Sequence, residues 1–283
     1  MIPFVQVDVS LEEVNMATQQ TPPEINTTVP QSARVYDYWL GGKDNFPADR
    51  ALGDAIAEQV PTIRTQVRGQ RAFLGRAVRY LAGEAGIRQF LDIGTGIPTA
   101  GNVHDVAQKL APESRVLYVD NDPIVLAHSR ALVPSSPQGR VEFILADLRD
   151  PEAILTDSAL SETLNLTEPV GLVLIGIMHH LRDDDDPRRI VTTLVDALAS
   201  GSYLVLSQTT PDFDPEAMRG LAEVSERGGI PNVPRTLADT EPFFAGLELV
   251  EPGLVPLAAW RPDPGTQGDP RTVYAYGAVA RKP

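Results

Sequence analysis

Alternation of two apolar patterns between residues 88 and 208 constrains the fold of this chain more than any other feature of its sequence. Short apolar runs with the length of buried strands alternate there with amphipathic segments at helical spacing. The expected strands are 88–93, 115–120, 141–146, 170–177 and 202–208, and the expected helices are 99–110, 122–133, 151–157 and 186–199. Such alternation is typical of an α/β fold whose mostly parallel sheet has helices on both faces.

The residues on either side of this stretch add a helical part and a sheet edge. The segment before it predicts one short helix and two longer amphipathic ones, preceded by an arm with little periodic apolar pattern. Near the other end, 246–251 and 272–280 predict two strands that form an antiparallel hairpin at the edge of the sheet. The expected division is a loose arm over 1–29 and a single domain over 30–283, with a helical cap over 30–86 and an α/β core over 87–283.

Composition argues against several classes of protein. The chain has 283 residues and a formal net charge of −14, whereas nucleic acids and anionic membranes attract basic surfaces. It contains no cysteine, which excludes disulfides and thiolate ligands. No apolar stretch approaches the roughly 20 residues that span a bilayer, and no signal-peptide pattern is visible. We expect a cytoplasmic protein that binds neither nucleic acid nor membrane.

The first expected strand ends in a carboxylate and a glycine-rich turn, formed by Asp92, Gly94, Thr95 and Gly96. Glycines allow turn conformations closed to other residues and let a ligand approach the backbone. Amides at the start of the following helix suit an anionic group, but Asp92 would repel a pyrophosphate. A ligand that carries both an ammonium and a carboxylate can use both features, and S-adenosylmethionine (SAM) is such a ligand.

Polar side chains also follow the next three expected strands, at the edge of the sheet where ligands of such folds bind. Asp120 and Asn121 follow the second strand, where a carboxylate can accept both hydroxyls of a ribose. Asp147 and Leu148 follow the third, where they can accept an adenine amino group and pack on the ring. His179 follows the fourth. The alternative is that aspartates here only cap the next helices, Asp122 the one after the second strand and Asp147 or Asp150 the one after the third.

These motifs resemble the class I SAM-dependent methyltransferases over about 88–208. Over 33–281 the chain is similar to a narrower group, the actinobacterial S-adenosyl methyltransferase family. The stretches that carry this closer match are ARVYDY at 33–38, LGGKDNF at 40–46, QFLDIGTG at 89–96, PTAGNVH at 98–104, YVDNDP at 118–123, ADLRDP at 146–151 and GSYL at 201–204. Pro98 departs from the broad class, in which a third glycine is common.

The resemblance implies a SAM site with roles for the strand-end residues. They are Asp92, Gly94, Thr95 and Gly96 at the methionine end, Asp120 with Asn121 at the ribose, and Asp147 with Leu148 at the adenine. It also implies that the N-terminal helical segment closes over the cofactor. Tyr36, Lys43 and Asn45 are then candidates to reach SAM, as are Arg34 and Asp44. The alternative is that Tyr36 belongs to the core and that the polar residues shape a turn.

We expect a methyltransferase that moves a methyl group from SAM to an oxygen or nitrogen of a small molecule. Alignment of the reacting atoms supplies most of the catalysis, and no spacing of His, Asp and Glu indicates a metal site. His179 is a candidate general base because its pKa range suits that role; the alternative is a histidine bonded to a neighbouring backbone. Two other classes stay open: an NAD(P)-binding oxidoreductase and a non-catalytic SAM-binding regulatory protein.

Overall fold

The computed structural model describes residues 26–132 and 136–283, and a mixed sheet forms its centre. The strand order is β3-β2-β1-β4-β5-β8-β6, with β7 also paired to β8. Five strands run parallel: β1 (Gln89–Ile93), β2 (Arg115–Asp120), β3 (Arg140–Leu145), β4 (Gly171–Leu174) and β5 (Tyr203–Thr209). Three form the antiparallel edge: β6 (Glu248–Leu249), β7 (Val255–Pro256) and β8 (Ala275–Arg281). The predicted fold class is confirmed.

The edge differs from the expected hairpin in one strand. The expected strand at 272–280 is β8, whereas the one at 246–251 is reduced to the two residues of β6. Gly246 precedes β6 with φ 80°, and Gly253 N donates to Val250 O at 2.9 Å to form a turn just after it. The chain therefore enters and leaves β6 too sharply for a longer strand.

The helices near the strands follow the predicted alternation. They are α4 (Val103–Leu110), α5 (Pro123–Leu132), α6 (Pro151–Thr156), α7 (Ser158–Thr163) and α8 (Pro187–Asp196). The remaining helices are α1 (Ser32–Leu40), α2 (Pro47–Gln59), α3 (Ile63–Gly83), α9 (Pro215–Arg227) and α10 (Leu237–Thr240). A shared local signal starts three of them: Asp150, Asp186 and Asp214 each precede a proline and accept a backbone N–H from the first turn.

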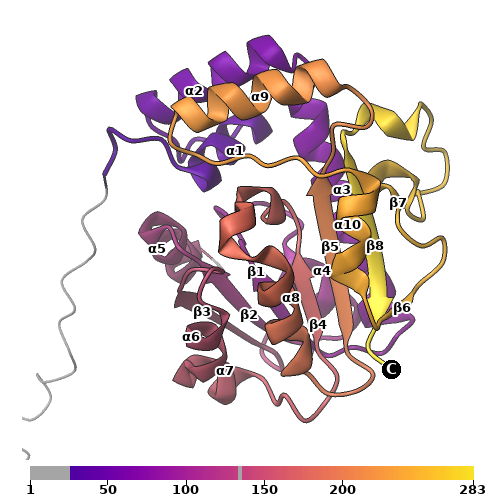
Figure 1. Cartoon of the computed structure of the whole chain (residues 1–283). Coiled ribbons are helices and arrows are strands. Elements are labelled where there is room, and N and C mark those ends of the chain that lie inside the picture. Colours follow the sequence, from indigo (N-terminus) through magenta and orange to yellow (C-terminus); the bar gives the residue numbers. More distant parts are fainter. Residues whose placement is uncertain (1–25, 133–135) are drawn as a thin grey trace, which may run out of the picture.

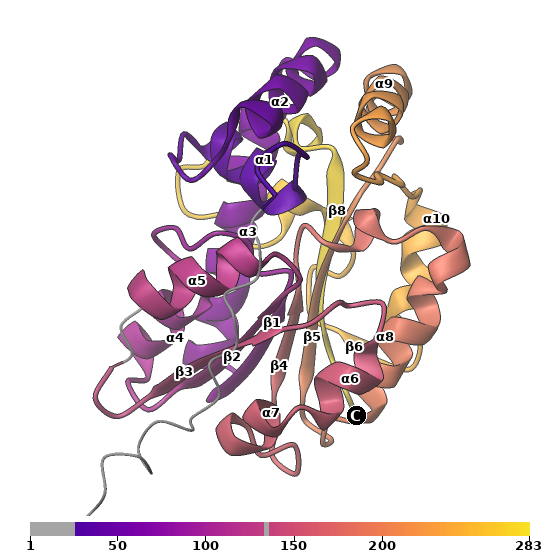
Figure 2. The same ribbon diagram turned by 90° about the vertical axis from the view of Figure 1, so that its left-hand side faces the viewer.

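Alternate residues of each strand face opposite layers of helices. Phe90 and Tyr118 pack in a buried cluster with α3 and α4, whereas Leu91 and Leu117 pack in another with α6, α7 and α8. Figure 2 shows the sheet between these two layers. The strands are therefore apolar on both faces, as the near-continuous apolar runs of the sequence predict.

A third layer lies beyond the carboxyl ends of the parallel strands, where α1, α2 and α9 gather at the top of Figure 1. These helices and the start of α3 share one buried cluster, although α9 lies more than 150 residues after α2 in the chain. Its members are Val35, Leu52, Ile56, Val60, Ile63, Met218, Leu221, Val224 and Ile230. In the part of the chain that the structure describes, no helix combines the length and apolarity needed to cross a membrane.

Candidate functional site

A cavity of about 460 Å³ separates the α1, α2 and α9 layer from the carboxyl ends of the parallel strands. Most of the residues singled out in the sequence line it: Tyr36, Asp92, Gly94, Thr95, Gly96, Asp120, Asn121, Asp147, Leu148 and His179. They come from α1 and from the ends of β1, β2, β3 and β4. The parallel sheet brings them together because the carboxyl ends of all its strands meet at one edge.

The turn after β1 is shaped by two glycines with positive φ, 78° at Gly94 and 68° at Gly96. A Cβ atom at Gly94 would lie 2.8 Å from the side chain of Ile177, so this position excludes any larger residue for steric reasons as well. At Gly96 a Cβ would meet nothing within 4 Å, and only the backbone conformation favours glycine. The Thr95 hydroxyl donates to Asp92 O at 3.1 Å and holds the turn against the strand.

Two carboxylates lie at the ends of the neighbouring strands β1 and β2, the buried Asp92 and the half-buried Asp120. Burial raises the pKa of Asp92 to about 7; the positive charge of Arg71 opposes this shift and the carboxylate of Asp120 adds to it. Burial likewise raises the pKa of Asp120 to about 6, although its oxygens accept N–H bonds from Asp122 at 2.9 Å and Gly96 at 2.8 Å. A cation bound beside both carboxylates would stabilise their ionised forms, which burial disfavours, so the site fits a positively charged ligand.

The carboxylate after β3 is in a different state. Arg149 donates to Asp147 from Nε at 2.9 Å and from Nη2 at 2.5 Å, and Asn121 Nδ2 donates to it at 3.1 Å. The hydrogen bonds from Arg149 are the main reason that the pKa of Asp147 falls to about 2. Asp147 is therefore ionised at neutral pH and does not cap the following helix, whose cap is Asp150.

Arg71 is a lining residue that the sequence reasoning missed. It projects from α3 with Gln66 and Gln70, which also line the cavity. Its guanidinium donates to Asn102 Oδ1 at 2.8 Å, and its charge acts on Asp92. The sequence does carry a signal: these polar residues interrupt the apolar face of α3 in its first half, at the spacing of successive helical turns.

The structure separates the three N-terminal candidates. Tyr36 lines the cavity, but its hydroxyl donates to Val67 O at 3.0 Å and burial raises its pKa to about 12, so it offers its ring. Asn45 lies outside the lining, where its amide donates to Asp37 Oδ2 at 2.8 Å and to Gly42 O at 3.1 Å. Lys43 is exposed and also lies outside the lining. Neither is brought to the cavity with the strand-end residues.

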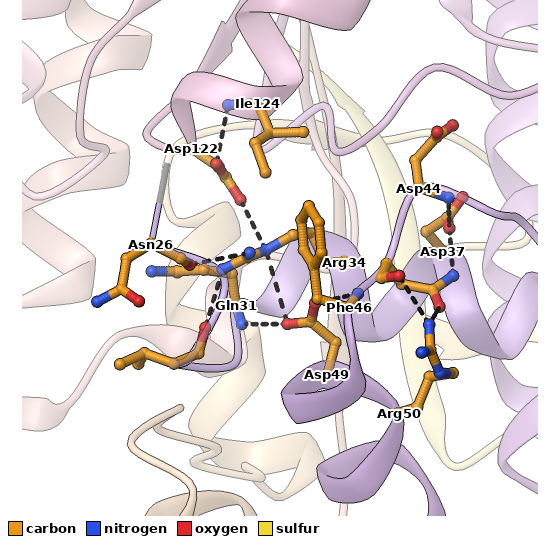
Figure 3. Close-up of polar contacts among 12 residues, drawn as sticks. Asn26, Gln31, Arg34, Asp37, Asp44, Phe46, Asp49, Arg50, Asp122 and Ile124 are labelled. Atoms are coloured by element: carbon orange, nitrogen blue, oxygen red, sulfur yellow. Dashed lines mark hydrogen bonds and ion pairs between the residues drawn. The ribbon is translucent and has the colours of Figure 1, made fainter. Parts of the chain in front are cut away.

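Arg34 is buried beside the cavity and connects α1 to two other elements (Figure 3). Its Nε lies 3.6 Å from Asp49 Oδ1 of α2 and 3.5 Å from Asp122 Oδ2, just before α5. Its two Nη atoms donate to backbone oxygens of Asn26 and Val29 at 3.1 and 2.9 Å. Arg34 therefore joins the N-terminal helices to the segment that follows β2, and it does not line the cavity.

The histidine after β4 lies in the short 3-10 helix η2 (Met178–His180) and is 8% exposed. Burial lowers the pKa of His179 well below its usual value, and His180 and Arg235 act in the same direction. His180 Nδ1 is 2.7 Å from Pro231 O, which fixes that ring, whereas His179 Nδ1 is enclosed and has no hydrogen-bond partner. His179 is therefore neutral at pH 7, and its backbone anchors it, since Val233 N donates to His179 O at 2.7 Å.

Comparison with known proteins identifies the family. The family model described as S-adenosyl methyltransferase matches residues 18–283. A crystal structure of a DUF574 family protein from Streptomyces avermitilis is 49% identical, with a TM-score of 0.89, and the match covers 92% of this chain and 100% of that one. A putative methyltransferase from Thermobifida fusca is 41% identical, with a TM-score of 0.85, and the match covers 94% and 99% of the two chains.

The fold is shared more widely. The plantazolicin methyltransferase BpumL, solved in complex with SAH, is 13% identical and has a TM-score of 0.50 over 89% of this chain and 95% of its own. No protein with curated annotation matches the chain. An oxidoreductase site is disfavoured on physical grounds, because Asp92 puts a buried carboxylate at the glycine turn where a pyrophosphate would have to bind. The chain belongs to the S-adenosyl methyltransferase family and is a SAM-dependent methyltransferase.

Proposed function

We propose that this methyltransferase acts on an oxygen or nitrogen atom of a small molecule that binds next to His179. The observation that carries the proposal is the single cavity that runs from the acidic strand ends to His179. Helices α1, α2 and α9 roof this cavity, which leaves room for a small acceptor rather than for a folded macromolecule. The net charge of −14 also argues against a nucleic acid as the acceptor.

The residues that line the acidic end would hold SAM. Asp92 is the group for the ammonium, Asp120 with Asn121 for the ribose, and Asp147 with Leu148 for the adenine. The turn of Gly94, Thr95 and Gly96 approaches the methionine end, where Arg71 can pair with the carboxylate. Lys43 and Asn45 are left out of this set.

SAM when bound supplies an electrophilic methyl group: the acceptor atom forms the new bond to carbon while the carbon–sulfur bond breaks and leaves its electron pair on sulfur. The protein then has to orient the acceptor and receive its proton. His179 suits the second task because it is neutral and lines the cavity. Nδ1 is enclosed by protein, so Nε2 is the nitrogen that we assign to the proton.

The affinity for SAM should depend on pH through the carboxylates of Asp92 and Asp120. In the free protein Asp92 and Asp120 take up protons as the pH falls through about 7 and about 6. The cationic ligand prefers the ionised forms, so the dissociation constant should rise as the pH is lowered from 8 to 5. Calorimetric titration with SAM over this range measures the effect. A dissociation constant that stays flat over these three pH units would contradict the assignment.

Turnover tests the proposed role of His179. His179→Ala should lower kcat by about a hundredfold, the usual size of a general-base contribution, while the affinity for SAM stays within about twofold. Labelled SAM incubated with a panel of small hydroxyl and amine compounds identifies an acceptor for the assay. If the wild-type protein binds SAM but methylates no small hydroxyl or amine compound of a broad panel, the proposed acceptor class is wrong. Equal kcat values for the wild-type protein and His179→Ala would show that His179 is not the base.

A further inference from the structure

The cavity is divided by charge. Its acidic lining residues all come from the ends of β1, β2 and β3. Arg71 and Arg149 line the same acidic end, where Arg71 acts on Asp92 and Arg149 is paired with Asp147. The lining between His179 and the layer of α1, α2 and α9, which we call the acceptor half, has an apolar roof made of Val35, Trp39, Ile56, Ile63, Leu221 and Ile230. Arg182 is the one charged residue that lines the acceptor half within the described chain, and it is half exposed and paired with Glu226 at 2.7 Å. A ligand in the acceptor half thus meets no unpaired charge.

Three residues on the other side of the acceptor half carry buried polar atoms with no hydrogen-bond partner. They are His179 Nδ1, Thr209 Oγ1 and Asn232 Oδ1, and all three residues line the cavity. A buried polar atom without a partner is destabilising, because it has lost its hydrogen bonds to water. Buried polar groups are normally satisfied by protein or by ordered water, and a polar group of a bound molecule can take the place of that water at Thr209 and Asn232.

Two backbone hydrogen bonds and one bond from a histidine ring hold these three residues next to one another. Val233 N donates to His179 O at 2.7 Å, and Pro231 O is 2.7 Å from His180 Nδ1, so the segment around Asn232 lies against η2. The same segment lies against the end of β5, because Arg235 N donates to Thr209 O at 2.9 Å. Three stretches far apart in the sequence thus form one polar floor under the apolar roof.

The lack of charge restricts what can bind there. A carboxylate or phosphate would lose its hydration without meeting a free cation, and an ammonium would do so without a carboxylate. An ammonium would also lie near the positively charged sulfur of SAM. An uncharged molecule with an apolar body avoids all of these costs and buries its surface against the roof.

We propose that the acceptor half takes an uncharged, mainly apolar molecule that carries a weakly acidic hydroxyl, of the phenol or enol type, and a second hydrogen-bonding group. The hydroxyl oxygen would lie at His179 and the second group at Asn232 and Thr209. This proposal rests on the proposed function. In the transfer, the hydroxyl oxygen bonds to the methyl carbon as the bond from that carbon to sulfur breaks toward sulfur, and the hydroxyl proton goes to His179.

The acidity of the hydroxyl follows from the base that faces it. Burial makes His179 a weaker base than a histidine in water, because it disfavours the charged ring. A phenol, with a pKa of about 10 as in tyrosine, gives up its proton to such a base far more readily than an aliphatic alcohol does. The uncharged lining favours a neutral molecule, and the weak base favours an acidic hydroxyl. A phenol or enol with an apolar body meets both conditions.

Matched probes test the proposal on the protein saturated with SAH. The dissociation constants of 2-naphthol, naphthalene, 2-naphthoate and 2-naphthylmethylammonium can be compared by ligand-observed NMR. We expect 2-naphthol to bind about tenfold more tightly than each of the other three, which corresponds to about 1.4 kcal/mol. Equal or tighter binding of an ion, no preference over naphthalene, or no detectable binding of 2-naphthol would each overturn the proposal.

Two variants locate the effect. Thr209→Val and Asn232→Ala should each reduce the preference for 2-naphthol over naphthalene by at least about threefold, the loss of one hydrogen bond. Thr156→Val, on the exposed side of α6, is the control and should change nothing. An unchanged preference in both cavity variants would overturn the proposed floor. SAH affinity checks their folding, and a wild-type protein that fails to bind SAH would contradict the proposed function itself.

Discussion

Asp92→Asn should weaken SAM binding by about a hundredfold at pH 8 and at the same time stabilise the free protein. The two effects have one cause, the burial of the Asp92 carboxylate at the end of β1, which is 7% exposed. Without ligand this charge has too little compensation, which is why burial raises its pKa to about 7. In the proposed complex the ammonium of SAM would pair with it, and loss of such a buried pair costs about 2–5 kcal/mol of binding energy.

The pH dependence of stability gives the sign of the second effect. Asp92 has a folded pKa of about 7 against an ordinary 3.8, so the folded protein holds the proton more tightly than the unfolded chain does. Its contribution to the free energy of unfolding therefore falls as the pH rises from about 4 to about 7 and stays low above that. Asn carries no charge, so at pH 8 the variant should gain up to about 4 kcal/mol, the upper limit set by three pKa units.

Calorimetry with SAM and urea denaturation of the free protein measure the two effects separately. Asp150→Asn is a matched control, because Asp150 caps α6 outside the cavity and asparagine caps equally well. It should leave both the affinity and the stability close to those of the parent. If Asp92→Asn binds SAM as tightly as the parent does, the methionine end of the ligand lies elsewhere in the cavity.

The second large effect is expected at Arg34. Arg34→Met should lower the free energy of unfolding by about 3–5 kcal/mol, the cost of leaving buried charges without their partner. Asp49 is fully buried and Asp122 is 6% exposed, and both face the Arg34 guanidinium (Figure 3). Denaturant unfolding monitored by circular dichroism measures the difference in free energy of unfolding between the parent and the variant.

Two further variants make this prediction specific. Arg182→Met removes the exposed pair with Glu226 and should change the free energy of unfolding little, because solvent screens exposed ion pairs. Arg34→Met combined with Asp122→Asn should recover part of the loss, because asparagine keeps the bond to Ile124 N and removes one unpaired charge. Equal stability of Arg34→Met and Arg182→Met would show that the buried cluster does not hold the N-terminal helices in place.

Much of the site was predictable because its residues lie at the ends of strands. The alternation of apolar runs is a local property of the chain, and it located the five parallel strands within a few residues. Parallel strands then deliver their carboxyl ends to one edge, so the positions of Asp92, Asp120 and Asp147 on the sequence already implied that they meet. The start of α8 also depends on a local pattern, because the Asp186 side chain accepts a hydrogen bond from Arg189 N only three residues later in the chain.

Other parts depended on which surfaces pack together, and no local pattern encodes that. Lys43 and Asn45 belong to the stretch LGGKDNF, which matches the family motif. In the structure, however, the Asn45 amide donates a hydrogen bond to Asp37 and Lys43 is exposed to solvent. In the sequence, Arg71 is one of several polar residues of an amphipathic helix. Its place in the cavity lining depends on how α3 packs against the sheet.

The sequence by itself determined the order of elements and the acidic strand ends, because both follow from spacings of a few residues. Tertiary structure alone decided that α9 joins α1 and α2 over the cavity, and that Thr209 and Asn232 lie beside His179. Burial of apolar faces drives such contacts without regard to distance along the chain, so their partners appear only when the whole chain has packed.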